Sequence, residues 1–128
     1  MIDHTGVNAS DFNKSKAFYS RVLSAIGYSL LVELPASVTG STDVAGFGEP
    51  PKPDFWISKG VPNNPPVHVA FRVATRAQVD AFFNVAIAAG GRDHGKPGVR
   101  SHYHPNYYGA FVLDLDGHNI EAVCHSPE

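Results

Sequence analysis

The sequence predicts an α+β fold made of two tandem βαβββ modules. Two observations lead to this fold class: a stretch near the start of the chain is repeated near its middle, and in each copy a helical spacing of apolar residues is followed by the alternation typical of strands. The chain has 128 residues, which is the length of one ordinary domain that can bury a core without disulfide bonds. We therefore expect a single domain over residues 1–128, with one module over about residues 1–62 and the other over about residues 66–125.

The repeat begins at two histidines, His4 and His68, which lie 64 positions apart and each open a strand-like run. The runs are HTGVNA at residues 4–9 and HVAFRV at residues 68–73. The same offset aligns three more groups without a gap: Ala17-Phe18-Tyr19 with Ala81-Phe82-Phe83, Ala25 with Ala89, and Gly27 with Gly91. Two copies of one unit explain this pattern, although strand–helix units can also resemble one another through the constraints of folding alone.

Each module is predicted to contain one helix of about three to four turns. In the second module, apolar residues recur at the spacing of one helical face: Val79, Phe82, Phe83, Ala86 and Ile87. Thr75 and Gln78 have the spacing of a capping box, and Gly90-Gly91 is a stop signal. In the first module Asp11 is the predicted N-cap, Gly27 ends the helix, and the apolar stripe is Phe18, Tyr19, Val22, Leu23 and Ile26.

After each helix, apolar and polar residues alternate as they do in strands. The first module is expected to form strands at residues 28–33, near residues 44–47 and at residues 54–59, with a loop over residues 35–52. In the second module, the clearest hairpin joins residues 110–115 to residues 118–123 through Asp116-Gly117, a pair that suits a type I′ turn. Residues 63–66, Asn-Asn-Pro-Pro, cannot continue a helix and are predicted to link the two modules.

The composition argues against several classes of partner. The 10 Lys and Arg residues are balanced by 12 Asp and Glu residues, and no basic run is present, so no nucleic-acid partner is expected. The single cysteine, Cys124, cannot form an internal disulfide, and its place on the last predicted strand favours a buried role. Apolar runs fall short of the roughly 20 residues of a membrane helix, and the N-terminus lacks the features of a signal peptide. We expect a soluble, cytoplasmic protein with no membrane partner.

Four segments resemble a known family: Ile2-Asp3-His4, Asp11 through Phe18-Tyr19, His68-Val69-Ala70-Phe71, and Asp114 through Glu121. Together with the repeat, they make the whole chain similar to the vicinal oxygen chelate superfamily, the glyoxalase, bleomycin-resistance and dioxygenase group, and to lactoylglutathione lyase in particular. The resemblance implies that the two modules pair into an open cupped barrel around one divalent metal ion. It also implies that His4, His68 and Glu121 are the metal ligands and that the protein is a homodimer.

These residue types suit a metal site, because two imidazole nitrogens and one carboxylate oxygen can hold Fe, Mn, Ni, Co or Zn. Open positions on the ion would accept substrate oxygens, so the metal could act as a Lewis acid on a developing enolate or as a template for oxygen activation. Glu121 could be both a ligand and the catalytic base. Each residue alone is more often an ordinary surface residue. The prediction depends on their conjunction, since the repeat relates His4 to His68 and Glu121 lies on the strand that the family uses.

A fourth metal ligand is missing from the sequence. The resemblance to lactoylglutathione lyases implies four protein ligands, the fourth of which lies on the last strand of the first module. The offset of 64 carries Glu121 onto Ile57, whose neighbours Phe55, Trp56 and Ser58 offer no carboxylate or imidazole. A three-ligand set is instead similar to the facial triad of the extradiol dioxygenases, although those enzymes usually have longer chains.

The segment over residues 100–109 is rich in His and Tyr and could line the mouth of the cup. Arg100 could bind an anionic substrate group, His102 or His104 could transfer a proton near neutral pH, and Tyr108 could donate a hydrogen bond to a bound oxygen. The segment could equally be a loop that packs on its own module or at a dimer contact. Trp56 is either a wall of the substrate pocket or a core residue.

The sequence thus predicts a metal-dependent enzyme that chelates adjacent oxygen atoms of a small substrate other than that of lactoylglutathione lyase. Two alternatives stay open: a metal-free, antibiotic-binding resistance protein whose cup is shared by two chains, and an extradiol-type dioxygenase. The presence of all three ligand types argues against the first alternative, and the chain length argues against the second.

Overall fold

The computed structural model describes residues 1–128 and contains two successive βαβββ modules, as the sequence predicts. The first module consists of β1 (Thr5–Ala9), α1 (Phe12–Ser24), β2 (Ser29–Leu34), the short helix α2 (Ala36–Thr39), β3 (Val44–Gly48) and β4 (Phe55–Lys59). The second module consists of β5 (His68–Arg72), α3 (Arg76–Ala88), β6 (Arg92–Val99), β7 (Tyr108–Leu113) and β8 (Asn119–Cys124). The predicted strands of the first module are all present, and α2 forms within the stretch that was predicted to be loop.

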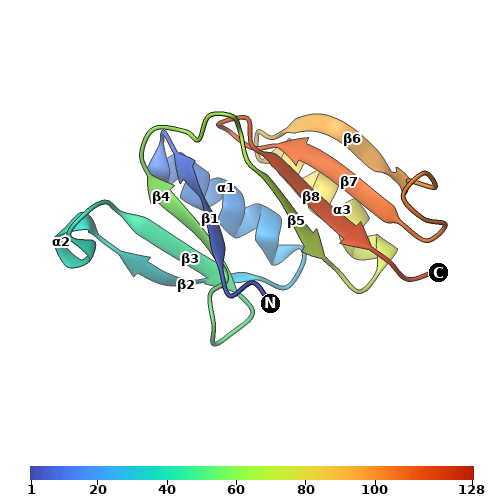
Figure 1. The fold of residues 1–128 in the computed structure, drawn as a ribbon, viewed down its shortest axis with the longest axis horizontal. Coiled ribbons are helices and arrows are strands. Elements are labelled where there is room, and N and C mark those ends of the chain that lie inside the picture. Colours follow the sequence, from blue (N-terminus) through green and yellow to red (C-terminus); the bar gives the residue numbers. More distant parts are fainter.

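Each module forms a four-stranded mixed sheet. The strand order is β1-β4-β3-β2 in the first sheet and β5-β8-β7-β6 in the second. The first strand of each module pairs in parallel with the last strand, and the other neighbours are antiparallel. Figure 1 shows the two sheets side by side, with α1 and α3 behind them and the other face of each sheet open. The sheets do not close on one another, so the fold is the predicted α+β, open cupped arrangement.

One hydrophobic core lies between the sheets and the helices and extends through both modules. It contains 20 buried residues, from Val7 near the start of the chain to Cys124 near its end. All residues of the apolar stripe predicted for the first helix are buried. In the second stripe Phe83 is only partly buried and Ile87 is 39% exposed. The prediction was therefore wrong at Ile87, because α3 buries a narrower face than the periodicity suggests.

Both long helices begin at the predicted capping residues. The side chain of Asp11 accepts a hydrogen bond from the backbone N–H of Lys14. Thr75 and Gln78 form the predicted capping box, in which the Thr75 hydroxyl oxygen accepts from the Gln78 N–H and the Gln78 side chain accepts from the Thr75 N–H. These bonds satisfy backbone donors that the first turn of a helix leaves free. None of the helices combines the length and apolar character that a membrane-crossing helix requires.

The β7–β8 hairpin is present, but its turn is not the type I′ turn predicted for Asp116-Gly117. A type I′ turn needs a positive φ at both central residues, and Gly117, at φ 89°, is the only residue of this loop with one. The loop instead has three residues between Asp114 and His118, whose backbone groups bond to each other. The reason is the Asp114 carboxylate, which accepts hydrogen bonds from the backbone N–H groups of Asp116 and His118 and so fixes a wider loop.

Candidate functional site

Glu121 lies on β8, next to β5 in the second sheet. Its neighbours Ile120 and Ala122 are fully buried in the core, and because side chains alternate along a strand, Glu121 points to the opposite, open face. Even there, Glu121 is only 1% exposed. A buried carboxylate requires polar partners, and Glu121 has one on each oxygen.

The partners of Glu121 are His68 and Tyr107. Nε2 of His68 lies 2.9 Å from Oε1 of Glu121, and the hydroxyl of Tyr107 donates a hydrogen bond to Oε2. The strand register explains the first contact: Ala70 lies opposite Glu121, so His68, two residues before Ala70, shares the same open face. The side chain of His68 is 51% exposed while that of Glu121 is buried. The site is therefore accessible from the His68 side.

The hydroxyl of Tyr107 is a stable hydrogen-bond donor. Burial, and then the hydrogen bond to Glu121, raise the pKa of Tyr107 above its ordinary value. Tyr107 therefore keeps its proton at all physiological pH values and can donate a hydrogen bond to the Glu121 carboxylate throughout this range.

A second polar atom beside His68 has no partner within the chain. Asn119 lies opposite His68 in the pairing of β5 with β8 and shares the open face with Glu121. Its Oδ1 atom is buried and accepts no hydrogen bond. Buried acceptors are normally satisfied, so Asn119 leaves one unsatisfied acceptor opposite His68 in the strand pairing.

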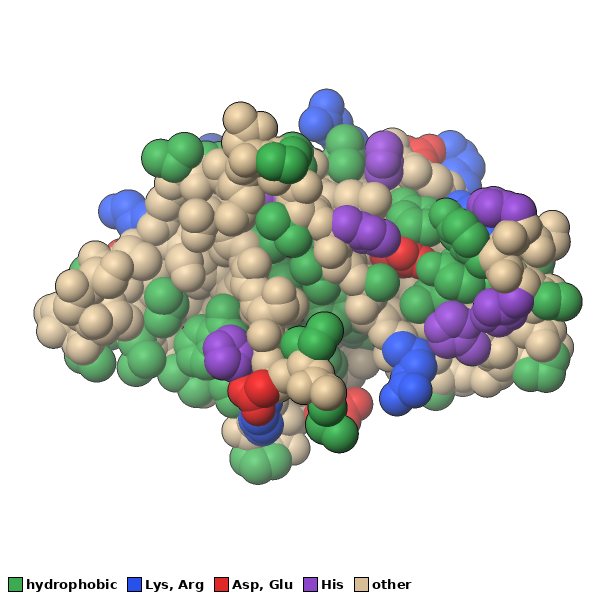
Figure 2. Space-filling view, in the orientation of Figure 1, with side chains coloured by type: hydrophobic (Ala, Val, Ile, Leu, Met, Phe, Trp, Pro, Cys, Tyr) green, Lys and Arg blue, Asp and Glu red, His purple; other side chains and the backbone are tan.

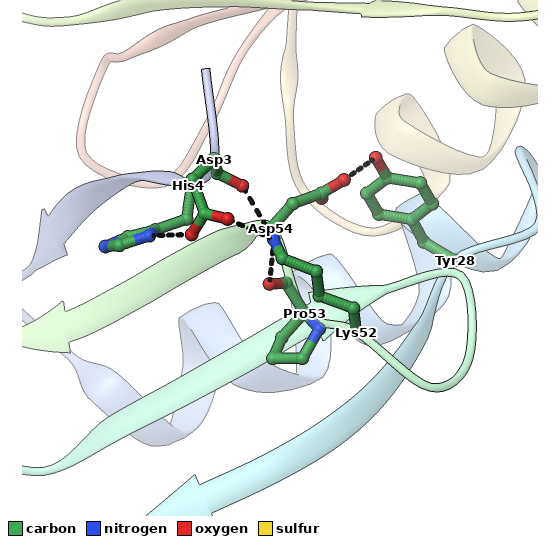
Figure 3. Close-up of polar contacts among 6 residues, drawn as sticks. All are labelled: Asp3, His4, Tyr28, Lys52, Pro53 and Asp54. Atoms are coloured by element: carbon green, nitrogen blue, oxygen red, sulfur yellow. Dashed lines mark hydrogen bonds and ion pairs between the residues drawn. The ribbon is translucent and has the colours of Figure 1, made fainter. Parts of the chain in front are cut away.

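His4 lies apart from His68, at the start of the first module. Its Nδ1 is 2.7 Å from Oδ2 of Asp3, and the ammonium group of Lys52 lies 3.2 Å from the other carboxylate oxygen of Asp3 (Figure 3). The hydrogen bonds with His4 and then Lys52 lower the pKa of Asp3. The His4 side chain is 62% exposed and lines a cavity of about 330 Å³ with Trp56, whereas His68 lines another cavity, of about 350 Å³, with Asp3 and Tyr28.

A single chain thus brings together two of the three predicted metal ligands. No group of three or more His, Cys, Asp or Glu side chains is placed to hold a metal ion. The pair that does form has the spacing of two neighbouring ligands in octahedral coordination, because two donors about 2.1 Å from one ion and at a right angle to each other are about 3.0 Å apart. The distance from Nε2 of His68 to Oε1 of Glu121 is 2.9 Å. These two residues fit a metal ion, and the same chain does not place His4 as the third ligand.

Trp56, not Ile57, is the counterpart of Glu121 in the first module. β1 and β4 pair with Gly6 opposite Trp56, whereas β5 and β8 pair with Ala70 opposite Glu121. The offset of 64 is correct for the first strands but becomes 65 at the last strands, because the bulged strands between them differ in length. The predicted equivalence with Ile57 was wrong by one residue, which in a strand reverses the face. Ile57 is fully buried in the core, and Trp56 offers no metal ligand.

The predicted residues of the 100–109 segment occupy different places. Arg100 is held within the chain: its guanidinium group donates to the backbone oxygens of Lys96 and Gly98 and lies over the ring of Phe111, 5.4 Å from the centroid. His102 is exposed and packs against Tyr103 with the two rings tilted and their centroids 4.2 Å apart.

His104 and Tyr108 also bond to other partners than the Glu121 carboxylate. Nε2 of His104 lies 2.8 Å from Nδ1 of His125. The hydroxyl of Tyr108 donates to Oδ1 of Asp80 on α3, at 2.7 Å, which places Tyr108 on the helix side of the sheet.

The tyrosine that reaches Glu121 is therefore Tyr107, which the sequence reasoning did not select. The signal was present in the alternation of β7: Tyr108 is in phase with Ala110 and Val112, both fully buried, so Tyr107 has the opposite phase. Figure 2 shows that the histidine side chains on the open face gather mainly over the half formed by β5 to β8, around this site.

Comparison with known proteins identifies the family. The model of the Glyoxalase/Bleomycin resistance protein/Dioxygenase superfamily matches residues 1–122. A glyoxalase/bleomycin resistance protein from Albidiferax ferrireducens T118 has a similar structure, with a TM-score of 0.78 and 24% identity over 97% of this chain and 98% of that chain. No curated protein matches the sequence.

Two further structures of this fold have more specific names. A mutant of the fosfomycin resistance protein FosX from Listeria monocytogenes, complexed with Mn(II) and 1S,2S-dihydroxypropylphosphonic acid, has a TM-score of 0.68 and 17% identity over 96% of this chain and 90% of that chain. A mutant of glyoxalase I from Zea mays has a TM-score of 0.71 and 17% identity over 99% of this chain but 45% of its own. At these identities the likeness shows the fold alone. With the family model matching nearly its whole length, the chain belongs to the Glyoxalase/Bleomycin resistance protein/Dioxygenase superfamily.

Proposed function

We propose that the protein is a metal-dependent enzyme that binds two adjacent oxygen atoms of a small substrate at an ion held by His68 and Glu121. The observation that supports this proposal most is the buried Glu121 carboxylate, whose Oε1 lies 2.9 Å from Nε2 of the accessible His68. Burying a carboxylate on an otherwise open sheet face is costly, so a functional reason for it is expected.

We further propose that His4 of a second copy of the chain supplies the third ligand. His4 is exposed and stands at the same position of its module as His68 does in the other. In a twofold dimer, a contact from one chain to its partner is repeated in the opposite direction. Two identical sites would then form, each with His68 and Glu121 from one chain and His4 from the other.

A divalent metal in this site would act as a Lewis acid on substrate oxygens. The protein's own residues would orient the substrate: Phe111, whose ring centroid is 6.2 Å from that of His68, offers an apolar wall beside the ion. The FosX complex contains Mn(II) together with a compound that carries two adjacent hydroxyl groups, which supports vicinal oxygens as the ligand class.

Metal binding after reconstitution tests the proposal. The native protein should bind Mn(II), Ni(II), Co(II) or Zn(II) in calorimetry, and His4→Ala, His68→Ala and Glu121→Gln should each weaken binding by at least tenfold. His102→Ala, which changes an exposed histidine outside the site, is the control and should bind as the native protein does. No metal binding by the native protein, or full affinity in all three variants, would overturn the proposal.

The reaction class requires a second experiment. Oxygen uptake with catechols would identify a dioxygenase, and isomerisation of a glutathione hemithioacetal would identify a lyase of the lactoylglutathione type. If the protein binds metal but shows neither activity, its substrate lies outside these two classes. The missing fourth ligand at Trp56 favours a substrate other than that of the lactoylglutathione lyases.

The separation of His4 from His68 within one chain also favours a second candidate, a metal-free binding protein. Trp56 is the single tryptophan and lines the cavity beside His4, so its fluorescence would report a planar ligand bound there. Ligand-dependent quenching in metal-free protein would support this candidate.

A further inference from the structure

We propose that Tyr107 is a positioning residue that fixes the orientation of the Glu121 carboxylate. Its hydroxyl donates a hydrogen bond to Oε2 of Glu121, so Oε1 is the oxygen that faces His68 and would face a bound metal ion. The consequence for metal binding rests on the proposed function, whereas the orientation itself does not.

The two oxygens of Glu121 are distinguished by their partners. A terminal carboxylate torsion has broad energy wells, so an unrestrained Glu121 could turn either oxygen, or both, toward His68. One partner on each oxygen removes this freedom: His68 contacts Oε1 and Tyr107 contacts Oε2. Tyr107 thereby favours a state in which Glu121 offers a metal ion one oxygen, Oε1, in a fixed direction.

Tyr107 is itself held in place by its backbone. Its N–H donates to the backbone oxygen of His104 at 3.2 Å, and its oxygen accepts from the N–H of Arg100 at 2.7 Å. These two bonds close the loop between β6 and β7 at Tyr107. Arg100, which was expected to bind substrate, instead forms hydrogen bonds that hold this loop together.

Aromatic neighbours fix the ring of Tyr107. The ring centroids of Tyr103, His104 and His125 lie 4.7, 5.5 and 5.4 Å from that of Tyr107. Gly109 leaves space for the ring, since a Cβ atom there would lie 3.1 Å from Cε1 of Tyr107 and 3.4 Å from Oε2 of Glu121. These neighbours hold the phenol ring beside the Glu121 carboxylate.

Residues that form hydrogen bonds to a metal ligand have a measurable effect on metal binding. Hydrogen bonds to a ligating side chain orient it, and their removal typically weakens metal binding by about 10- to 100-fold. Tyr107→Phe removes only the hydroxyl and leaves the ring to pack, so it isolates this effect.

The chain provides a matched control next to Tyr107. Tyr108→Phe also removes one hydrogen-bonded hydroxyl, but that hydroxyl bonds to Asp80 on the helix side of the sheet. With Mn(II) as the probe, Tyr107→Phe should lower the affinity by about 10- to 100-fold and change the Mn(II) electron paramagnetic resonance spectrum. Tyr108→Phe should do neither, even if it unfolds at a lower temperature.

A metal-free measurement separates this inference from the proposed function. In the apo protein, the side-chain carboxyl carbon of Glu121 should shift in the NMR spectrum of Tyr107→Phe and stay unchanged in Tyr108→Phe. If the native protein binds no metal, the proposed function fails, and the carboxyl shift still decides the orientation of Glu121. Unchanged Mn(II) affinity and spectrum in Tyr107→Phe, or an unchanged Glu121 carboxyl shift, would overturn the positioning role.

Discussion

Tyr19 and Asp114 form a buried hydrogen-bonded pair that joins α1 to the loop between β7 and β8. The Tyr19 hydroxyl donates to Oδ2 of Asp114, and the two residues are 1% and 4% exposed. Burial, and then the charge of Asp114, raise the pKa of Tyr19 well above its ordinary value. The neutral phenol is thus the form that the folded protein stabilises.

This pair predicts a loss of stability in alkaline solution. Below about pH 10 both the folded and the unfolded states keep the Tyr19 proton. Above it the unfolded state loses the proton first, so the free energy of unfolding falls by up to about 1.4 kcal/mol per pH unit until the folded state ionises too. Urea titrations between pH 8 and 11 should show a shallower decline for Tyr19→Phe than for the native protein. Parallel declines would show that Tyr19 does not contribute.

At the residue scale, sequence reasoning identified residue types better than contacts. It selected Glu121 and His68, which do meet, because a repeat and a strand position mark them. It chose Tyr108 over Tyr107 because it considered the loop composition and not the phase of the following strand. The contacts of Arg100 with the backbone oxygens of Lys96 and Gly98 could not be predicted, since they depend on how a loop closes.

At the scale of elements, the beginning of α3 depends on one reciprocal contact. Thr75→Ala removes the side-chain acceptor of the capping box and should lower the free energy of unfolding by about 1 kcal/mol, within a range of about 0.5–2 kcal/mol. Gln78→Ala removes the other half and should have a smaller effect, because the Thr75 hydroxyl still satisfies a first-turn donor. Chemical denaturation measures both changes. An effect of Thr75→Ala below the experimental error would mean that another acceptor replaces the cap.

The elements themselves were predictable because local patterns determine them. Asp11 and Thr75 mark helix starts by side chains that bond within one turn, and the Asp116-Gly117 pair marks a hairpin. The register between distant strands was not predictable in the same way. The bulges where β2 pairs with β3 and where β6 pairs with β7 differ between the modules and shift the repeat by one residue. This shift places Trp56, and not Ile57, on the open face.

At the scale of the whole molecule, the β7–β8 loop joins the two modules. Asp114 bonds to Tyr19, Asp116 accepts from both the N–H and the hydroxyl of Ser10, and the fully buried His118 lies between the modules. Nδ1 of His118 accepts from the N–H of Val67, and Nε2 lies 3.1 Å from the oxygen of Asn8, to which it donates. The Asp-Leu-Asp-Gly-His run, which is part of one of the four segments that resemble the family, thus holds one module against the other.

Replacing His118 should therefore weaken the packing of the two modules against each other. His118→Phe keeps a ring of similar shape but leaves a backbone donor at Val67 and an acceptor at Asn8 without partners. Each such group costs about 1–3 kcal/mol, so the free energy of unfolding should fall by at least that amount. His102→Ala, at an exposed position, should change it by no more than about 0.5 kcal/mol. Equal stability of the two variants would show that His118 makes no net contribution between the modules.

The fold of the whole molecule followed from the sequence, but the assembly of the site did not. The repeat relates His4 to His68 and suggests that both face one ion. In the structure each lies by the edge strand of its own sheet, β1 or β5, and lines its own cavity. Which edge meets which is decided by long-range packing and by any second chain, neither of which leaves a local pattern in the sequence.

Mixing two variants that each lack one proposed ligand tests whether a second chain completes the site. In a twofold dimer of a His4→Ala chain with a His68→Ala chain, one site loses both histidines and the other keeps its full set of ligands. If chains pair at random after being unfolded and refolded together, half of the dimers are mixed, so about a quarter of all sites should regain metal binding. Each variant refolded alone should regain none. The same mixture would bind no metal if His4 and His68 of one chain had to meet, because every chain lacks one of them. Calorimetric stoichiometry with Mn(II) distinguishes these two outcomes, and the second would place the complete site within a single chain.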